Sequence, residues 1–335
     1  MIGKANGRPV TVTGLGVHVP ERVLTNDELA ELVDTSDEWI VERTGIRERR
    51  IARDDEALTD IALPAARRAL EMAGVDPRTI DLVVVATVTP DMTFPSASAL
   101  LADALGMRDA AAYDLSAGCT GFVYAIAQAQ AMLAAGLSRR ALVVGGDVLS
   151  KILDWSDRST LVLFGDGAGA VLLEAAEDGG GFLGFELGAD GGGGANLWLP
   201  GSGSRRFDDP EKYVKMNGRE VFKFATRVMV SSAEAILGAC GLAVDDVDVY
   251  VPHQANVRII DHAVRKLGID PAKTVINVDK YGNTSSGSIP LALADAADDG
   301  RLKPGKLVLL TGMGAGLTWG SALIRWTHDT IGAAA

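Results

Sequence analysis

The chain has 335 residues, of which 47% are apolar and 23% charged, and its formal net charge at pH 7 is −12. This length allows one large domain or two ordinary ones with a sizeable core, and the composition excludes a disordered chain. The negative charge argues against general binding to nucleic acids.

The sequence contains two cysteines, Cys119 and Cys240, which are too few for a disulfide framework and lack the spacing of a metal site. Residues 1–8 do not resemble a signal peptide, and no apolar run reaches the ~20 residues that span a membrane. We therefore expect a cytoplasmic protein with no bound metal and no membrane or nucleic-acid partner.

Two capping-box patterns begin short helices near the start of the chain, Thr25-Asn26-Asp27-Glu28 and Thr35-Ser36-Asp37-Glu38. The second helix ends near Gly45 and carries Trp39 and Arg43 on one face, four residues apart. Periodicity further predicts helices at 58–73 and 96–105, and strands at 10–16, 81–86, 110–115 and 141–145. This alternation predicts a mostly parallel sheet covered on both faces, whereas the glycine-rich residues 179–194 predict a surface loop.

Cys119 lies in the sequence Ala117-Gly118-Cys119-Thr120-Gly121, between a strand-like run and a long apolar helical pattern that ends at Gly136. The pattern places Cys119 on a strand-to-helix turn, where unpaired backbone N–H groups and the helix dipole favour a thiolate. A lone cysteine is more often a buried, inert thiol. The small neighbours on both sides favour a nucleophile that a substrate can reach.

The second half of the sequence repeats the order of the first. Residues 70–83 match 237–250 at an offset of 167 residues, and 104–107 match 266–269 at an offset of 162. A third match joins 142–144 to 307–309 at an offset of 165. Several matches in one order predict an internal duplication, with α/β halves at 1–174 and 175–335 that each have their own sheet.

The repeat also places two further polar residues near Cys119. Asn283 lies 164 residues after Cys119, between a predicted strand at 274–278 and a helix. His253 follows the C-terminal end of another predicted strand, the edge at which ligands of parallel sheets gather. If the halves pack about a pseudo-twofold axis, Cys119, His253 and Asn283 converge between them.

A Cys, a His and an Asn in this order suit two chemistries. The first is a papain-like thiol hydrolase, whose His and Asn follow the Cys by roughly 130–150 residues. The internal duplication and the absence of a Cys-Gly-Ser-Cys-Trp signature stand against it. The second is carbon–carbon bond formation on thioesters, in which the Cys takes an acyl group and the His and Asn donate to an enolate oxygen.

Motifs along nearly the whole chain resemble those of the 3-oxoacyl-[acyl-carrier-protein] synthase III family, which starts type II fatty acid synthesis. They are Asp34-Thr35-Ser36-Asp37-Glu38-Trp39-Ile40, Arg43-Thr44-Gly45-Ile46-Arg47-Glu48-Arg49, Phe94-Pro95-Ser96-Ala97, Phe164-Gly165-Asp166-Gly167-Ala168-Gly169-Ala170, Pro252-His253-Gln254-Ala255-Asn256, Gly282-Asn283-Thr284-Ser285 and Thr318-Trp319-Gly320-Ser321-Ala322. Asn283 points to this branch, because elongating synthases have a second His. The resemblance implies a thiolase-like fold with mixed, mostly parallel sheets in five layers, αβαβα.

The resemblance also implies a catalytic sequence. A starter acyl-CoA would acylate Cys119, and His253 and Asn283 would then promote decarboxylation of malonyl-acyl carrier protein and stabilise the enolate. Backbone N–H groups of Cys119 and Gly316 would form the oxyanion hole. The acyl-CoA and the carrier protein would serve as substrates, with no resident cofactor.

Further residues are implied to bind the substrates or a second subunit. The implied contacts of coenzyme A are Trp39, Arg43, Thr44, Arg158, Gly218 and Asn256. Phe94 would reach the acyl pocket of the neighbouring subunit across a homodimer. The implied docking patch for the acidic carrier protein consists of Lys223, Arg258, Arg265 and Lys266.

The sequence differs from many family members next to the nucleophile, where Gly118 and Thr120 replace two alanines. Both residues are small, so we expect the chemistry to be retained. Acetyl, branched and longer starters all stay open, because the residues of the starter pocket are scattered. A related ketosynthase or acyltransferase of secondary metabolism is the alternative, and a Cys-His-Asn thiol hydrolase is a remote one.

Overall fold

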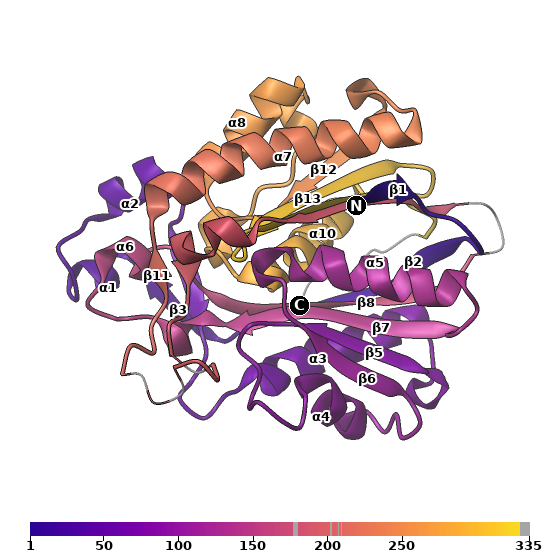
Figure 1. Ribbon diagram of the computed structural model, residues 1–335, viewed down its shortest axis with the longest axis horizontal. Helices are drawn as coiled ribbons and strands as arrows, with labels where there is room; N and C mark the ends of the chain where they lie inside the picture. The colour runs from indigo at the N-terminus through magenta and orange to yellow at the C-terminus, as the bar shows by residue number, and fades with distance from the viewer. Residues whose placement is uncertain (177–179, 202, 207, 209, 329–335) are drawn as a thin grey trace.

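The computed structural model describes residues 1–328 except 177–179, 202, 207 and 209. Two five-stranded sheets lie one above the other, with helices between them and on both outer faces (Figure 1). The expected five-layered α/β architecture is therefore confirmed.

The first sheet has the strand order β2-β8-β7-β5-β6. Its strands are β2 (Val10–His18), β5 (Leu82–Ala86), β6 (Ala111–Leu115), β7 (Arg140–Val148) and β8 (Asp166–Ala175). The second sheet has the order β1-β9-β14-β13-β12. Its strands are β1 (Ile2–Lys4), β9 (Gly181–Ala189), β12 (Val249–Pro252), β13 (Leu307–Gly314) and β14 (Thr318–Arg325).

The expectation of mostly parallel strands is wrong. Parallel pairing is found between β5 and β6, β5 and β7, and β12 and β13, and the other neighbours in both sheets are antiparallel. The pair β13 and β14 shows why antiparallel pairing occurs here. Only residues 315–317 separate the two strands. So short a connection permits an antiparallel hairpin, whereas parallel strands need a long crossover.

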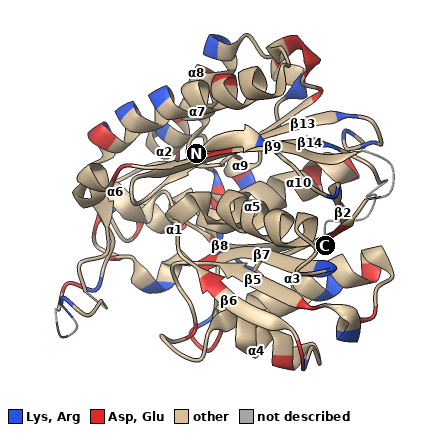
Figure 2. Cartoon of the chain, turned by 45° about the vertical axis from the view of Figure 1, so that its right-hand side comes forward, with Lys and Arg blue, Asp and Glu red and all other residues tan. Residues whose placement is uncertain are grey.

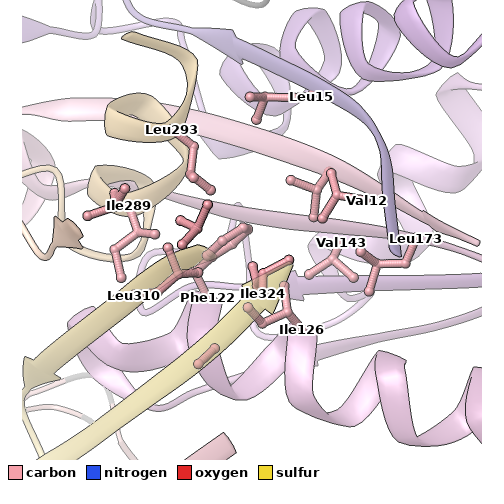
Figure 3. Packing of buried hydrophobic residues seen from close by; sticks show 14 of the residues in the cluster. Val12, Leu15, Phe122, Ile126, Val143, Leu173, Ile289, Leu293, Leu310 and Ile324 are labelled. Carbon is pink, nitrogen blue, oxygen red and sulfur yellow. The ribbon is translucent and has the colours of Figure 1, made fainter. Parts of the chain in front are cut away.

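The central layer consists of α5 (Gly121–Ala134) and α10 (Ser288–Asp298). Figure 3 shows Phe122 and Ile126 of α5 near Leu310 and Ile324 of the second sheet, in the cluster that also contains Ile289 and Leu293 of α10. Fully burying one such aliphatic or aromatic side chain contributes about 1.5–3 kcal/mol. This layer fixes the two sheets relative to each other, and Cys119 and Asn283 lie just before the N-terminal ends of its two helices.

The outer helices cover the remaining faces. Helices α3 (Leu58–Ala73) and α4 (Ala97–Ala104) pack on the first sheet, and α7 (Gly218–Cys240) and α8 (Val257–Leu267) pack on the second. The shorter helices are α1 (Asn26–Ala30), α2 (Asp37–Thr44), α6 (Arg158–Leu161) and α9 (Val278–Tyr281). Two small sheets pair β3 (Arg22–Thr25) with β4 (Glu48–Ile51) and β10 (Leu197–Trp198) with β11 (Lys215–Met216). No described helix is long and apolar enough to cross a bilayer.

The local capping signals are largely confirmed. Thr25 and Glu28 form the expected capping box at the start of α1. The cap of α2 is Ser36, one residue later than the start of the predicted pattern, and its hydroxyl accepts from the Trp39 N–H. Gly45 ends α2 with a φ of 80°, a left-handed conformation that favours glycine.

Two other expectations are wrong. The glycine-rich stretch forms β9 and a 3₁₀ segment, Gly191–Asn196, in place of a surface loop. The predicted strand at 274–278 is reduced to one bridge, in which Thr274 pairs with Tyr250 before the chain enters α9.

The structure shows a more regular repeat than the sequence matches do. The 3₁₀ turn η2 (Gly118–Thr120) and helix α5 recur as η7 (Ser285–Gly287) and α10, each starting 167 residues later. Cys119 therefore corresponds to Ser286, and not to Asn283 as the offset of 164 indicated. The division into halves at residue 174 stays a prediction, and β1 is an exception to it because it pairs with β9.

Candidate active site

Cys119 lies on the expected strand-to-helix turn. Strand β6 ends at Leu115, η2 contains Cys119, and α5 begins directly after it. Gly118 has a φ of 56°, and a Cβ there would come within 2.8 Å of the carbonyl oxygen of Ala315. A larger residue at position 118 would therefore require a shift of the neighbouring backbone. The glycine lets the turn that carries Cys119 lie close to the segment after β13.

The environment of Cys119 favours the protonated thiol. The side chain is only 7% exposed, and this burial raises the pKa of the thiol to about 11, with the Asp147 carboxylate acting in the same direction. The Ser285 hydroxyl and the backbone N–H groups of Cys119 and Ala315 act against this shift. The expectation that the turn favours a thiolate is therefore not met, because the cost of desolvation exceeds what these hydrogen bonds contribute.

His253 directly follows β12 and is 1% exposed. Its backbone N–H donates to the carbonyl of Thr311, which ties it to β13. Its ring Nδ1 lies 2.5 Å from Ser288 Oγ, and its Nε2 has no partner. Burial lowers the pKa of His253 to about 3, so the ring is neutral at physiological pH.

Asn283 is held by backbone contacts on both sides. Its N–H donates to Leu163 O at 2.8 Å, and its carbonyl accepts from Gly165 N at 3.0 Å. The side-chain Oδ1 accepts from the Ser285 N–H at 2.9 Å. Since the oxygen is engaged there, the Nδ2 amino group remains as the donor toward the cavity.

Cys119, His253 and Asn283 line one cavity of about 170 Å³, with Phe164, Met313 and Gly314 among its other walls. A second cavity of about 150 Å³ also reaches Cys119. Its walls are largely apolar and consist of Val88, Gly118, Leu149, Ile152, Phe164, Leu197, Trp198, Leu199, Val214, Ser285 and Ala315. The sulfur therefore lies where two cavities meet, one with hydrogen-bond donors and one that suits a hydrocarbon chain.

The second N–H group next to the sulfur belongs to a residue that the sequence did not single out. The N–H of Ala315 interacts with the Cys119 thiol, and Ala315 lines the apolar cavity. Gly316, which the resemblance implied, lines neither of the two cavities. The geometry thus favours Ala315 over Gly316 as the partner of the Cys119 N–H in an oxyanion hole.

The site can be compared with known proteins at this point. The family model for 3-oxoacyl-[acyl-carrier-protein] synthase III matches residues 113–191, and the model of its C-terminal part matches residues 237–326. The beta-ketoacyl-[acyl-carrier-protein] synthase III of Symbiobacterium thermophilum is 54% identical over 95% of this chain and 98% of its own length. The chain belongs to the synthase III family.

Solved structures of similar proteins have the same fold over nearly the whole chain. The synthase III of Thermus thermophilus has a TM-score of 0.90 at 48% identity, covering 94% of this chain and 99% of the other. The priming beta-ketosynthase of the R1128 polyketide pathway has a TM-score of 0.91 at 38% identity, covering 97% and 98%. Membership in the synthase III family identifies a condensing acyltransferase with a thiolase-like fold, and it decides between the two chemistries in favour of carbon–carbon bond formation.

Five residues implied to bind coenzyme A lie in one region around the cavity of Cys119. The guanidinium groups of Arg43 and Arg158 each lie 4.9 Å from the centre of the Trp39 ring. Asn256 Nδ2 donates to the Arg43 carbonyl at 3.0 Å, and both Asn256 and Gly218 line the cavity of Cys119. An aromatic ring with two cations, joined to this cavity through Asn256, suits a nucleotide that carries phosphates.

Thr44 does not fit this role. Its side chain is buried, its hydroxyl donates to Ile40 O at 2.6 Å, and it accepts from the Ile46 N–H at 3.0 Å. These bonds close the end of α2. The hydroxyl hydrogen is therefore used within the protein and is not available to a ligand.

The implied dimer contact and the implied docking patch lie on the surface. Phe94 is 82% exposed, which is unusual for so large an apolar side chain. Arg258 lies 5.7 Å from the Phe222 ring, and both line a surface hollow of about 510 Å³ together with Arg265. Phe222 also lines the cavity of Cys119, so the hollow adjoins it.

The basic residues of this region are mixed with acidic ones. Lys223 pairs with Glu220 at 2.6 Å, and Lys266 is exposed but does not line the hollow. Figure 2 shows several Lys and Arg positions, in blue, along α7 and near α8, together with acidic positions, in red. In the part of the chain that the structure describes, no cluster of His, Cys, Asp and Glu could hold a metal ion.

Proposed function

We propose that this synthase III transfers a starter acyl group from an acyl-CoA to Cys119 and condenses it with malonyl-acyl carrier protein. The products are 3-oxoacyl-acyl carrier protein, carbon dioxide and free CoA. The observation that carries the proposal is the position of Cys119 at the junction of a donor-lined cavity and an apolar cavity. The acyl chain would occupy the apolar cavity, and the malonyl thioester the other.

In the first half-reaction, the Cys119 sulfur attacks the thioester carbonyl. A sulfur–carbon bond to Cys119 forms, the bond to CoA breaks, and the thiol proton leaves with CoA. The N–H groups of Cys119 and Ala315 stabilise the oxyanion and also lower the pKa of the thiol. Because burial favours the protonated thiol, the loss of its proton is coupled to the attack on the acyl-CoA thioester.

In the second half-reaction, the malonyl group loses carbon dioxide and leaves an enolate. Asn283 Nδ2 and a ring N–H of His253 donate to the enolate oxygen. The enolate carbon then attacks the acyl-Cys119 thioester, so that a carbon–carbon bond forms and the thiolate is released. Neither donor gains or loses a proton, in keeping with the low pKa of the buried His253. The proposed chemistry needs no resident cofactor.

Three features support the proposed partners. The cluster of Trp39, Arg43 and Arg158 suits the nucleotide end of coenzyme A. The hollow beside Phe222 offers Arg258 and Arg265 to an acidic carrier protein. The exposed Phe94 suits a homodimer in which it is covered by the neighbouring subunit. We further propose that the enzyme acts in the cytoplasm, where type II synthesis of fatty acids supplies both substrates.

A role in secondary metabolism is the second candidate. It is favoured by the likeness to the priming beta-ketosynthase of a polyketide pathway. Both candidates use the same cysteine chemistry and differ in the starter and in the acceptor.

The experiment that tests the function is a panel of acyl-CoA starters with malonyl-acyl carrier protein. We expect 3-oxoacyl-acyl carrier protein, carbon dioxide and CoA in equal amounts for at least one starter. Transfer to another acceptor without carbon dioxide release would favour the secondary-metabolite candidate. Cleavage of peptides or esters as the main activity would contradict the proposal altogether.

The docking of the carrier protein is expected to be electrostatic. Arg258→Glu should raise the KM for malonyl-acyl carrier protein strongly and leave that for acyl-CoA largely unchanged, because it reverses one charge of the hollow. Added salt should weaken the use of the carrier protein by the wild-type enzyme, since the Debye length is only ~8 Å at physiological ionic strength.

The matched control is Lys303→Glu, the same change of charge before the N-terminal end of β13, whereas Cys119 lies against Gly314 at the other end of that strand. It should alter neither KM. Equal changes in both KM values for Arg258→Glu, or a lower melting temperature for that variant, would show that Arg258 instead stabilises its own helix.

A further inference from the structure

A buried serine contacts the Nδ1 side of the His253 ring. Ser288 is the first residue of α10, and its hydroxyl lies 2.5 Å from His253 Nδ1. The same hydroxyl accepts a longer hydrogen bond, 3.4 Å, from the backbone N–H of Gln254. Both Ser288 and His253 are buried, and Ser288 lies outside the two cavities that reach Cys119.

These contacts distinguish the two neutral forms of the imidazole. If Nδ1 accepts, the Gln254 N–H donates to Ser288 Oγ, the hydroxyl donates to Nδ1, and among these groups only the Nε2–H is left without an acceptor in the protein. If Nδ1 carries the proton, it donates to Ser288 Oγ, and the hydroxyl hydrogen is left with no acceptor among the contacts that the structure shows. The second arrangement leaves both the hydroxyl hydrogen and Nε2 unpaired, whereas the first leaves only the Nε2–H. Each unpaired buried polar group is costly, so the first arrangement is favoured.

We propose that Ser288 is a positioning residue that holds His253 as the tautomer with its proton on Nε2. The unpartnered Nε2 then presents an N–H to the cavity shared with Cys119 and Asn283. The hydrogen bond made by one ring nitrogen sets the state of the other. This proposal rests on the proposed function, in which His253 donates to the enolate oxygen.

A chemical consequence separates the two half-reactions. In this tautomer Nε2 has no free lone pair, so His253 cannot take the proton of the Cys119 thiol. The acylation of Cys119 thus proceeds without His253 as a base, and decarboxylation depends on it as a donor. Ser288 should therefore affect the second half-reaction and leave the first unchanged.

The kinetic test compares Ser288→Ala with Ser288→Thr, which keeps a hydroxyl. Ser288→Ala should retain the transfer of label from acyl-CoA to Cys119 and slow carbon dioxide release by about tenfold or more. We expect less than the ~10²–10³ that follows the loss of a donor itself, because Nε2–H remains accessible to part of the population. Ser288→Thr should restore most of the rate.

The spectroscopic test reads the tautomer directly in the resting enzyme, by nitrogen NMR of protein labelled with ¹⁵N-histidine. The chain has 4 histidines, so the signals of His253 can be identified from their loss in His253→Asn. The wild type should show the proton on Nε2, and Ser288→Ala should show a mixture. Ser232→Ala is the control, because Ser232 is also buried and bonded to Glu186 and Ser321 but lies on α7.

The proposal is overturned if wild-type His253 carries its proton on Nδ1, or if Ser288→Ala leaves both the tautomer and carbon dioxide release unchanged. A fall in melting temperature equal to that of Ser232→Ala, with unchanged kinetics, would show a purely structural serine. Failure of the proposed function gives a different result, since the wild type would then release no carbon dioxide while the NMR outcome still stands.

Discussion

Cys119→Ser is expected to abolish formation of the acyl-enzyme. The serine hydroxyl is a far weaker nucleophile than sulfur, and in the proposed tautomer of His253 neither ring nitrogen can take its proton, because Nε2 carries a hydrogen and Nδ1 accepts from Ser288. Incubation with radiolabelled acyl-CoA followed by denaturation measures the label that stays bound to protein. The substitution replaces one sulfur atom by a smaller oxygen atom in a packed turn, so the fold should be retained.

Cys240→Ser is the matched control for this experiment. Cys240 is the last residue of α7 and is partly buried, and it lies outside the two cavities that reach Cys119. This variant should take up label as the wild type does. Label that persists in Cys119→Ser and disappears in Cys240→Ser would remove Cys119 as the nucleophile.

Asn283→Asp is expected to retain acylation of Cys119 and to lower the rate of decarboxylation by about 10²–10³. The Ser285 N–H can still donate to a carboxylate oxygen, so the side chain should keep its orientation. The second oxygen then faces the cavity in place of the Nδ2 donor, and it repels the developing enolate. Measuring bound acyl label and released carbon dioxide on the same sample separates the two steps.

Asn6→Asp makes the same chemical change at an exposed position and should leave both steps unaltered. The assignment of Asn283 fails if Asn283→Asp releases carbon dioxide near the wild-type rate. Loss of both steps together would instead indicate that the loop around Asn283 had been disturbed. Asn283 forms a backbone bridge with Phe164, and Phe164 lines both cavities. A disturbed loop would therefore shift a wall of both cavities and affect both steps.

Local signals in the sequence determined much of the fold. The capping box at Thr25, the apolar stripe of residues 58–73 and the glycine-flanked turn at Cys119 each act within a few residues along the chain. Such interactions depend only on residues that are neighbours in the sequence, and the structure therefore has these elements where they were predicted. The order of Cys, His and Asn, with the duplication, was also enough to predict their convergence at one cavity.

Tertiary structure alone decided the contacts between distant segments. Ser288 meets His253 across 35 residues of sequence, and Ala315 reaches Cys119 because β13 ends beside η2. The antiparallel directions of β9 and β14 likewise depend on how the chain crosses between layers. Such contacts follow from packing around the shared central helices, which brings together residues whose types and spacing carry no local signal. The state of the Cys119 thiol was decided in the same way, since residues from both halves of the chain bury the sulfur and raise its pKa.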